Sequence, residues 1–390
     1  MTRSAAPQEI RIGIVGAGLM GREIAAAIQR WPALIDHPVR PRLVAVCDIN
    51  PAALEWFRQI DTVEHFATAH TDLLALEDVD AVYIAVRHDL HEHLYLDAVR
   101  AGKDLLAEKP FGIDSDAARR IIRAIDETGV FVRVSSEMPF FPGAQAVIEY
   151  ARSGAAGRLV QVRSGFLHSS DLAPLKPINW KRQARYCGAA GVMNDLGLHA
   201  WHAPLRLGWR PSRLTAQLQD LVPARPGPDG VSVPCDTWEN AAVHADVETP
   251  DGPFVLDVSA SRIAPGSKNT WYLEVTGMEG GARFTTADPK RVEYFGTIDT
   301  PIGREQSWQS VEVGSQSVWP TVTGGIFESG FSDAILQMWA AFLAERAGAL
   351  GDRFGCATPA EALACHEMAD AAALSHAEGI RVAPASDTAS

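Results

Sequence analysis

The feature that most constrains this chain is a glycine motif close to its start. A β-branched run, Arg11–Val15, leads directly into Gly16-x-Gly18-x-x-Gly21, and apolar residues then recur at helical spacing over 22–29. A strand, a glycine turn and a helix in this order are typical of a dinucleotide site, because the glycines let the backbone approach a pyrophosphate at the helix N-terminus. The residues predicted to contact the dinucleotide here are Gly16, Gly18, Leu19, Met20 and Gly21.

The second predicted strand indicates which dinucleotide binds. It runs over Leu43–Cys47 and ends at Asp48. A carboxylate at this point accepts hydrogen bonds from both ribose hydroxyls and repels a 2'-phosphate. The next residues, Ile49 and Asn50, bring no basic side chain that could hold such a phosphate. The sequence therefore predicts NAD, and not NADP, as the cofactor.

Two kinds of element pattern follow one another along the chain. Strands first alternate with helices, which predicts an α/β Rossmann domain with a doubly wound parallel sheet over 1–135. From about Leu159 the strands lie close together in sequence, separated by Gly and Pro turns, which predicts a large, mostly antiparallel sheet. With amphipathic helices at Phe331–Arg346 and Pro359–His376, these strands form a predicted α+β domain for substrate binding and oligomerisation over 136–390.

Composition limits the possible partners. The 390 residues exceed the size at which one core usually serves, which agrees with two domains. The 48 acidic and 35 basic residues give a formal charge of -13, and this excludes nucleic acid or an anionic membrane surface as the main partner. Met1–Ile10 lacks a signal-peptide pattern, and no apolar run approaches the roughly 18 residues of a membrane helix. We therefore expect a soluble, cytoplasmic protein.

Three residues that can move a proton follow the nucleotide motif. Lys109 comes directly after a predicted strand, at the sheet edge where open α/β sheets bind ligands. Asp195 and His199 are four residues apart, so on a helix they share one face. A lysine, a carboxylate and an imidazole beside a nicotinamide suit removal of a hydroxyl proton while hydride leaves the same carbon. Taken alone, such an Asp and His are more often a helix cap and an ordinary buried histidine.

Three segments together resemble the glucose-fructose oxidoreductase/inositol dehydrogenase (Gfo/Idh/MocA) family. They are GIVGAGLMG at 13–21, EKP at 108–110 and GVMNDLGLHAWH at 191–202. The resemblance implies an NAD-dependent oxidoreductase that acts on a ring hydroxyl of a sugar, polyol or glycoside. It also implies that the C-terminal sheet pairs subunits into a homodimer or homotetramer.

The same resemblance implies roles for individual residues. Lys109, Asp195 and His199 would be catalytic, with the choice of Lys109 or His199 as the base left open. The further cofactor-binding positions that it implies are Ala85, His91, Glu108 and Lys109.

The chain departs from the family pattern at two places. Arg87 stands where the family usually has a proline, and a guanidinium there can bind a carboxylate, sulfonate or phosphate through two hydrogen bonds. The segment 136–142 lacks the arginine that many members carry in an aromatic-Arg-Phe run. That absence puts any substrate contact usually made there in doubt.

A basic loop supplies the remaining substrate-binding candidates. Lys176, Lys181, Arg182 and Arg185 lie within ten residues that contain no acid. Asn179-Trp180-Lys181 also resembles a Trp-basic pair that lies over the active site in the family. The loop favours an anionic sugar as substrate, and the alternative is an ordinary solvated basic loop. The predicted substrate contacts are Arg87, Trp180, Lys181, Arg182, Asp195 and His199.

Two other functions fit the same motifs. One is a redox-neutral glycoside hydrolase, in which NAD oxidises the sugar transiently before elimination and hydration, for example on a sulfoquinovose-type glycoside. The other is a non-catalytic NAD-binding regulator.

We predict no metal, because neither His88-x-x-His91-x-His93 nor Asp195 with His199 and His202 matches a metal-ligand motif.

Overall fold

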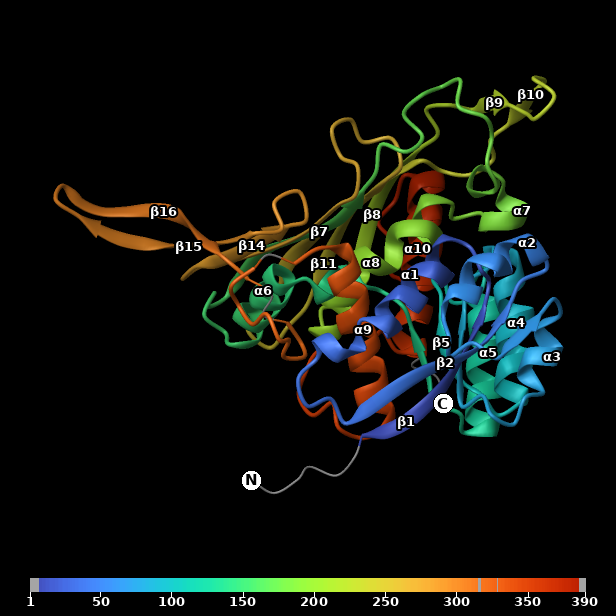
Figure 1. The fold of residues 1–390 in the computed structure, drawn as a ribbon. Helices are drawn as coiled ribbons and strands as arrows, with labels where there is room; N and C mark the ends of the chain where they lie inside the picture. The colour runs from blue at the N-terminus through green and yellow to red at the C-terminus, as the bar shows by residue number, and fades with distance from the viewer. Residues whose placement is uncertain (1–6, 315–316, 328, 386–390) are drawn as a thin grey trace, which may run out of the picture. The chain divides into compact units, whose positions relative to one another are not determined.

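The computed structural model describes residues 7–314, 317–327 and 329–385, and Figure 1 traces their fold. The chain divides into two compact units, of which the first comprises residues 1–140 and 315–360 and the second comprises 141–314 and 361–390. This division differs from the predicted boundary at residue 135, because a late segment of the chain belongs to the first unit.

The first unit is built on a six-stranded parallel sheet. Its strands are β1 (Gln8–Val15), β2 (Val39–Cys47), β3 (His65–Ala67), β4 (Ala81–Ile84), β5 (Asp104–Ala107) and β6 (Val132–Val134). The strand order β3-β2-β1-β4-β5-β6 is that of a doubly wound dinucleotide-binding sheet, so the predicted Rossmann architecture is confirmed. β4 is buried at every position, as expected for a central parallel strand covered on both faces.

Local sequence signals set the helix ends of the first unit. Its helices are α1 (Leu19–Gln29), α2 (Pro51–Leu54), α3 (His70–Leu74), α4 (His91–Arg100), α5 (Ser115–Thr128) and α9 (Phe331–Arg346). α5 follows Asp114, whose carboxylate accepts a hydrogen bond from Ala117 N at 2.8 Å. The same helix ends at Gly129, which has a φ of 72° that favours glycine.

Helix α9 explains why the late segment belongs to the first unit. Its residues from Ala334 to Ala344 are all buried, and a helix that is apolar on nearly every side needs cover all round. α9 packs along α1, and the ring of its Trp339 lies 6.0 Å from that of Tyr83 on β4. Arg346 at its end donates to Asp104 at 2.6 Å. α9 therefore completes the core of the nucleotide-binding unit.

The second unit is built on an eight-stranded sheet. Its strands are β7 (Leu159–Leu167), β8 (Pro211–Gln219), β11 (Asn240–Val247), β12 (Phe254–Ser261), β13 (Thr270–Gly277), β14 (Gly281–Thr285), β15 (Arg291–Thr300) and β16 (Gly303–Glu312). The order is β16-β15-β14-β13-β7-β12-β11-β8. β7 and β12 are parallel, whereas the other neighbours in this order are antiparallel. The predicted mostly antiparallel sheet is thus confirmed.

Helices pack on one face of this sheet. α6 (Pro142–Arg152) packs against β13 and β14, and α8 (Val192–Arg206) packs against β7 and β12. Ser164 of β7 fixes α8 by donating to the carbonyl of Ala200 at 2.7 Å. The sheet therefore positions α8, the helix that carries the Asp-x-x-x-His pattern.

The remaining helices and strands of the second unit are short, except for one helix. They are α7 (Ala184–Cys187), β9 (Ala224–Pro226), β10 (Ser232–Pro234) and the long α10 (Pro359–Glu378). The β15–β16 hairpin extends away from the rest of its sheet (Figure 1). Among the described residues, no helix is both long and apolar enough to cross a membrane.

Candidate active site

The turn between β1 and α1 has the geometry of a pyrophosphate cradle. Gly16 has a φ of 104°, and a Cβ there would lie 2.2 Å from the carbonyl oxygen of Ala85. A Cβ on Gly21 would lie 2.0 Å from the carbonyl oxygen of Gly16. By contrast, a Cβ on Gly18 would meet no protein atom within 4 Å. The first and third glycines are thus required by the fold, whereas Gly18 leaves space open at the start of the helix.

Asp48 lies beside this turn and is already oriented. Its Oδ2 accepts a hydrogen bond from Ala17 N at 2.8 Å, and its Oδ1 accepts one from Asn50 N at 2.8 Å. Leu19 and Met20 form the first turn of α1, which carries no acidic residue. A helix N-terminus without a competing carboxylate, next to an oriented acid, fits a dinucleotide with a free adenosine ribose.

The carboxyl ends of β4, β5 and β6 meet at Glu108. Its carboxylate accepts hydrogen bonds from the Tyr83 hydroxyl, from Ser135 Oγ at 2.7 Å and from Lys109 N at 3.1 Å. Tyr95 also donates to the Glu108 carbonyl oxygen at 2.7 Å. This buried cluster fixes the backbone of Lys109 at the carboxyl edge of the same sheet that carries the glycine turn.

His91 lies between the loop that follows β4 and the loop that follows β5. Its Nδ1 lies 2.7 Å from the carbonyl oxygen of Pro110, and its Nε2 lies 3.1 Å from that of Val86. Burial lowers the pKa of His91 to about 4, so the imidazole is neutral. A neutral imidazole has a single N–H, so it donates to only one of these two carbonyls, and its ring lies between the loop after β4, which contains Ala85, and the loop after β5. A direct contact of His91 with the cofactor stays a prediction.

Glu137 is a buried carboxyl group that the sequence reasoning missed. Burial and the negative charge of the neighbouring Glu108 raise its pKa to about 7, although Lys109 acts in the opposite direction. A group with this pKa exchanges a proton near neutral pH. The signal available in the sequence was an acid placed among the apolar residues that follow a strand.

In the second unit, α8 presents Asp195 and His199 one turn apart. The helix follows Gly191, whose φ is 54°. Asp195 and His199 are both buried. The His199 ring packs edge-on against Phe166 at 5.0 Å between ring centres, and its carbonyl oxygen accepts a hydrogen bond from Trp271 Nε1 at 2.7 Å. Sheet side chains thus hold the imidazole in place.

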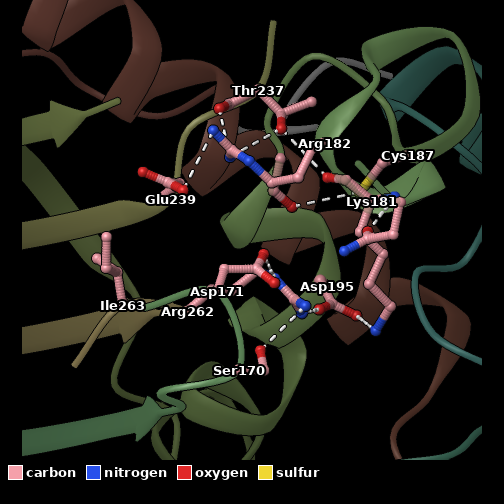
Figure 2. A network of polar contacts seen from close by, with 12 residues as sticks. Ser170, Asp171, Lys181, Arg182, Cys187, Asp195, Thr237, Glu239, Arg262 and Ile263 are labelled. Atoms are coloured by element: carbon pink, nitrogen blue, oxygen red, sulfur yellow. Dashed lines mark hydrogen bonds and ion pairs between the residues drawn. The ribbon is translucent and has the colours of Figure 1, made fainter. Parts of the chain in front are cut away.

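Asp195 lies between two cations (Figure 2). Its Oδ1 accepts a hydrogen bond from Lys181 Nζ at 2.7 Å, and its Oδ2 contacts Arg262 Nη1. Behind Arg262 lies Asp171, with Oδ2 2.9 Å from Arg262 Nε. Burial opposes ionisation of Asp171, but Arg262 and Lys176 outweigh it and lower the pKa of Asp171 to about 2. Neither Arg262 nor Asp171 was predicted, because no motif marks them.

The basic loop is compensated by acids from elsewhere in the chain. Lys176 pairs with Asp171 at 2.9 Å, and Arg182 pairs with Asp220 at 2.8 Å, in addition to the pair between Lys181 and Asp195. Arg185 stacks on Tyr186, 4.4 Å from the ring centre. Most of the positive charge of the loop is therefore paired with carboxylates that lie outside the loop.

The contacts of Arg87 and of two tryptophans near the predicted site are as follows. Arg87 donates to both carboxylate oxygens of Asp89, at 2.5 and 2.8 Å. Trp180 begins a short 3₁₀ turn, and Lys181 Nζ lies over its ring, 5.4 Å from the ring centre. Trp201 is completely buried and belongs to the core of the second unit.

Of the histidines in the His88-x-x-His91-x-His93 pattern, the first two have ring centres 5.3 Å apart, whereas the third lies with other partners. His91 is buried, whereas His93 lies towards the surface near His70 and Asp97. One potential ligand atom from each of His70, His93 and Asp97 lies within 4.8 Å of the others, and His70 Nε2 is 2.8 Å from Asp97 Oδ2. The three histidines therefore do not form one group as the sequence pattern could suggest.

Two family models match successive parts of the chain. One is described as an oxidoreductase family with an NAD-binding Rossmann fold and matches residues 10–136. The other is described as the GFO/IDH/MocA C-terminal domain and matches residues 144–283.

Curated relatives and solved structures agree with these models. Levoglucosan dehydrogenase of Pseudarthrobacter phenanthrenivorans is 25% identical over 295 residues, which cover 71% of this chain and 74% of that protein. Inositol 2-dehydrogenase of Rhizobium meliloti is 26% identical over 293 residues, covering 73% and 78%. The structure of levoglucosan dehydrogenase in complex with NADH and levoglucosan matches 97% of this chain and 100% of its own, with a TM-score of 0.86 at 21% identity. At this identity the structural match shows the shared fold.

Proposed function

The chain belongs to the GFO/IDH/MocA family of oxidoreductases with an NAD-binding Rossmann domain, and from this premise we propose that it oxidises a ring hydroxyl of a sugar, polyol or glycoside. The observation that carries the proposal lies in the first unit. The glycine turn, Asp48 and the rigidly held Lys109 lie at the carboxyl edge of one parallel sheet, which is where such sheets bind cofactor and substrate.

The relatives support a polyhydroxylated ring as the substrate class. By their names, they act on levoglucosan and on inositol. Trp180 adds a half-exposed aromatic ring beside Lys181 in this chain, and an aromatic face with a neighbouring donor suits the C–H surface and hydroxyls of a sugar.

The proposed roles follow from the environment of each group. Gly16, Gly18 and Gly21 admit the pyrophosphate of NAD, and Asp48 receives its ribose hydroxyls. When bound, NAD supplies the hydride acceptor. Asp195, held between Lys181 and Arg262, acts as a fixed negative charge.

Two groups remain as acceptors of the hydroxyl proton. His199 is proposed to take it, while Lys109 polarises the same oxygen or relays the proton. Neighbours within each unit fix the backbone of both residues, since Lys109 N donates to Glu108 and Trp271 donates to the carbonyl oxygen of His199. Phe166 also packs against the His199 ring.

The ion pairs weigh against an anionic substrate. Arg87, Lys176, Lys181 and Arg182 each have a carboxylate partner, so an anion would compete with an existing pair at each of them. We therefore propose a neutral ring. Thermal unfolding with NAD and matched neutral, carboxylated and sulfonated sugars tests this point: a neutral sugar should raise the midpoint most, and stabilisation by the sulfonated sugars alone would overturn it.

Replacement of Lys109 by methionine tests the reaction. The variant should fold and bind NADH normally but turn over about a hundredfold more slowly or worse, because the group that acts on the hydroxyl is gone. NADH formation and NADH fluorescence titration measure the two properties. Lys268→Met, at an exposed loop position, is the matched control and should keep normal turnover.

Three results would contradict the proposal. Normal turnover of Lys109→Met would remove the assigned role. Release of an aglycone from a chromogenic glycoside without NADH accumulation would identify the redox-neutral hydrolase instead. NADH binding without turnover of any neutral or charged sugar would point to a regulator.

A further inference from the structure

The parallel pairing of β7 with β12 gathers charged side chains at a single sheet edge. Because the two strands run in the same direction, with Leu167 beside Ser261, both end at the same edge. Asp171 lies in the segment after β7, and Arg262 is the residue that follows β12. Asp171 N donates to the Arg262 carbonyl oxygen at 3.0 Å, which fixes the two segments to each other.

Arg262 bridges three acceptors at this edge (Figure 2). Nε donates to Asp171 Oδ2 at 2.9 Å, Nη2 donates to Ser170 Oγ at 3.1 Å, and Nη1 contacts Asp195 Oδ2. Arg262 is 6% exposed, and Asp171 and Asp195 are fully buried. The planar guanidinium is thus held from behind by Asp171 and Ser170 while it holds Asp195 in front. A lysine, with a single nitrogen, cannot span these acceptors.

The fixed carboxylate of Asp195 in turn holds the ammonium group of Lys181. Lys181 Nζ donates to the other oxygen, Oδ1, at 2.7 Å, and the Lys181 side chain stays 28% exposed. The Lys181 backbone is fixed separately, since its N–H donates to Asn179 Oδ1 at 2.9 Å and its carbonyl accepts from Thr237 Oγ1 at 3.1 Å. Asp195 therefore connects a buried guanidinium to an ammonium that reaches solvent.

We propose that Arg262 is a positioning residue of the active site, which fixes the Asp195 carboxylate in one orientation and, through it, the Lys181 ammonium. The inference rests on the proposed function, because Asp195 and Lys181 are assigned to the active site by that function. Arg262 needs no contact with substrate or cofactor in this role. Its effect is to keep two groups at the geometry that the reaction requires.

Arg262→Lys tests the role while keeping the positive charge. It should lower kcat by about tenfold to a hundredfold, because a displaced carboxylate misplaces the groups that depend on it. The KM for NAD should stay unchanged, since the NAD-binding residues lie in the first unit. Asp171→Asn, which leaves both Arg262 and Asp195 in place, should lower kcat in the same direction by a smaller factor.

Arg206→Lys is the matched control. Arg206, at the far end of α8, donates to both oxygens of Glu361, at 2.5 and 2.7 Å. The Arg206→Lys variant loses a two-bond arginine–carboxylate pair in the same unit, and this pair does not contact Asp195. This variant should lose some thermal stability and keep normal kcat.

A double-mutant cycle on thermal unfolding gives a readout that needs no substrate. The shifts in unfolding midpoint caused by Arg262→Lys and Lys181→Met should not add, because both act on the Asp195 carboxylate. The shifts caused by Arg206→Lys and Lys181→Met should add.

The outcomes separate the positioning role from the proposed function. An additive Arg262–Lys181 cycle, or a kcat loss in Arg262→Lys no larger than in Arg206→Lys, would overturn the positioning role. A non-additive cycle in a protein that oxidises no sugar would support the coupling through Asp195 and reject the proposed oxidation.

Discussion

At the scale of single residues, Glu108 and Glu137 show how one buried carboxyl group affects another. Glu108 is surrounded by donors from Tyr83, Ser135 and Lys109, which stabilise its charge. Glu137 lies close enough for that charge to raise its own pKa. Burial and a neighbouring acid thus act in the same direction on the pKa of Glu137.

This environment predicts a pH-dependent effect of Glu137→Gln on stability. The folded state raises the Glu137 pKa from 4.5 to about 7, so the wild-type protein loses stability as pH rises through this window, by about 3 kcal/mol in total. The glutamine variant has no such loss. Its stability relative to wild type should therefore increase between about pH 4.5 and 7 and stay constant above, as measured by urea unfolding.

The control for this prediction is Glu127→Gln, at an exposed position in the last turn of α5. Its stability relative to wild type should not vary with pH in this way. If the Glu137→Gln difference is equally flat across the window, Glu137 ionises normally in the folded protein.

Sequence patterns predict site residues only where the pattern is local. The glycines and Asp48 are recognisable because the strand, turn and helix that give them meaning are adjacent in sequence. Arg262 is separated from Asp195 by 67 positions and from Asp171 by 91. The parallel pairing of β7 with β12 brings Arg262 to Asp171, and the packing of α8 on these strands brings it to Asp195. The basic loop shows the same limit only in part: Arg182 pairs with an acid 38 positions away, whereas the partners of Lys181 and Lys176 are 14 and 5 positions away.

At the scale of elements, the turn between β1 and α1 contains glycines with two different roles, one in packing of the fold and one in leaving space for a ligand. Gly21 is required for helix packing, because a Cβ would lie 2.0 Å from a backbone oxygen. Gly18 has φ -74° and ψ -159°, extended angles that alanine can adopt, and a Cβ there would meet no protein atom within 4 Å. The fold tolerates a side chain at Gly18, and the proposed pyrophosphate does not.

We therefore expect Gly18→Ala to unfold at the wild-type temperature but to bind NADH at least tenfold more weakly, since the added methyl group occupies ligand space. Gly21→Ala should instead lose more than about 2 kcal/mol of stability. Thermal unfolding and NADH fluorescence titration distinguish the two. Equal loss of stability in both variants would mean that Gly18 also has a structural duty.

The bounds of α9, Phe331–Arg346, could be predicted because the helix is a long and nearly continuous apolar run. The prediction that this helix is amphipathic is wrong, because its residues from Ala334 to Ala344 are all buried. β16 was not predicted, because its side chains are nearly all exposed and its sequence has no buried face to alternate with a polar one. β3, β9 and β10 contain three residues each, too few for a period to be recognised.

At the scale of the whole molecule, the first unit is assembled from separate stretches of sequence. We expect a fragment of residues 1–140 to lack cooperative unfolding, because it omits α9 and leaves the partners of Trp339 uncovered. The same fragment joined by a flexible linker to residues 315–360 should unfold cooperatively and bind NADH. Circular dichroism during heating measures this, and cooperative unfolding of the short fragment would show that α9 is dispensable.

The placement of α9 also affects the order of events during biosynthesis. A nucleotide-binding domain encoded in one stretch could fold while the rest of the chain was still being translated. Here the ribosome must pass residue 346 before α9 is complete, and at about 5 to 20 residues per second the growing chain waits on the order of tens of seconds. During that interval the apolar surface reserved for α9 is open to chaperones, and the second unit, whose last stretch is 361–390, is completed later still.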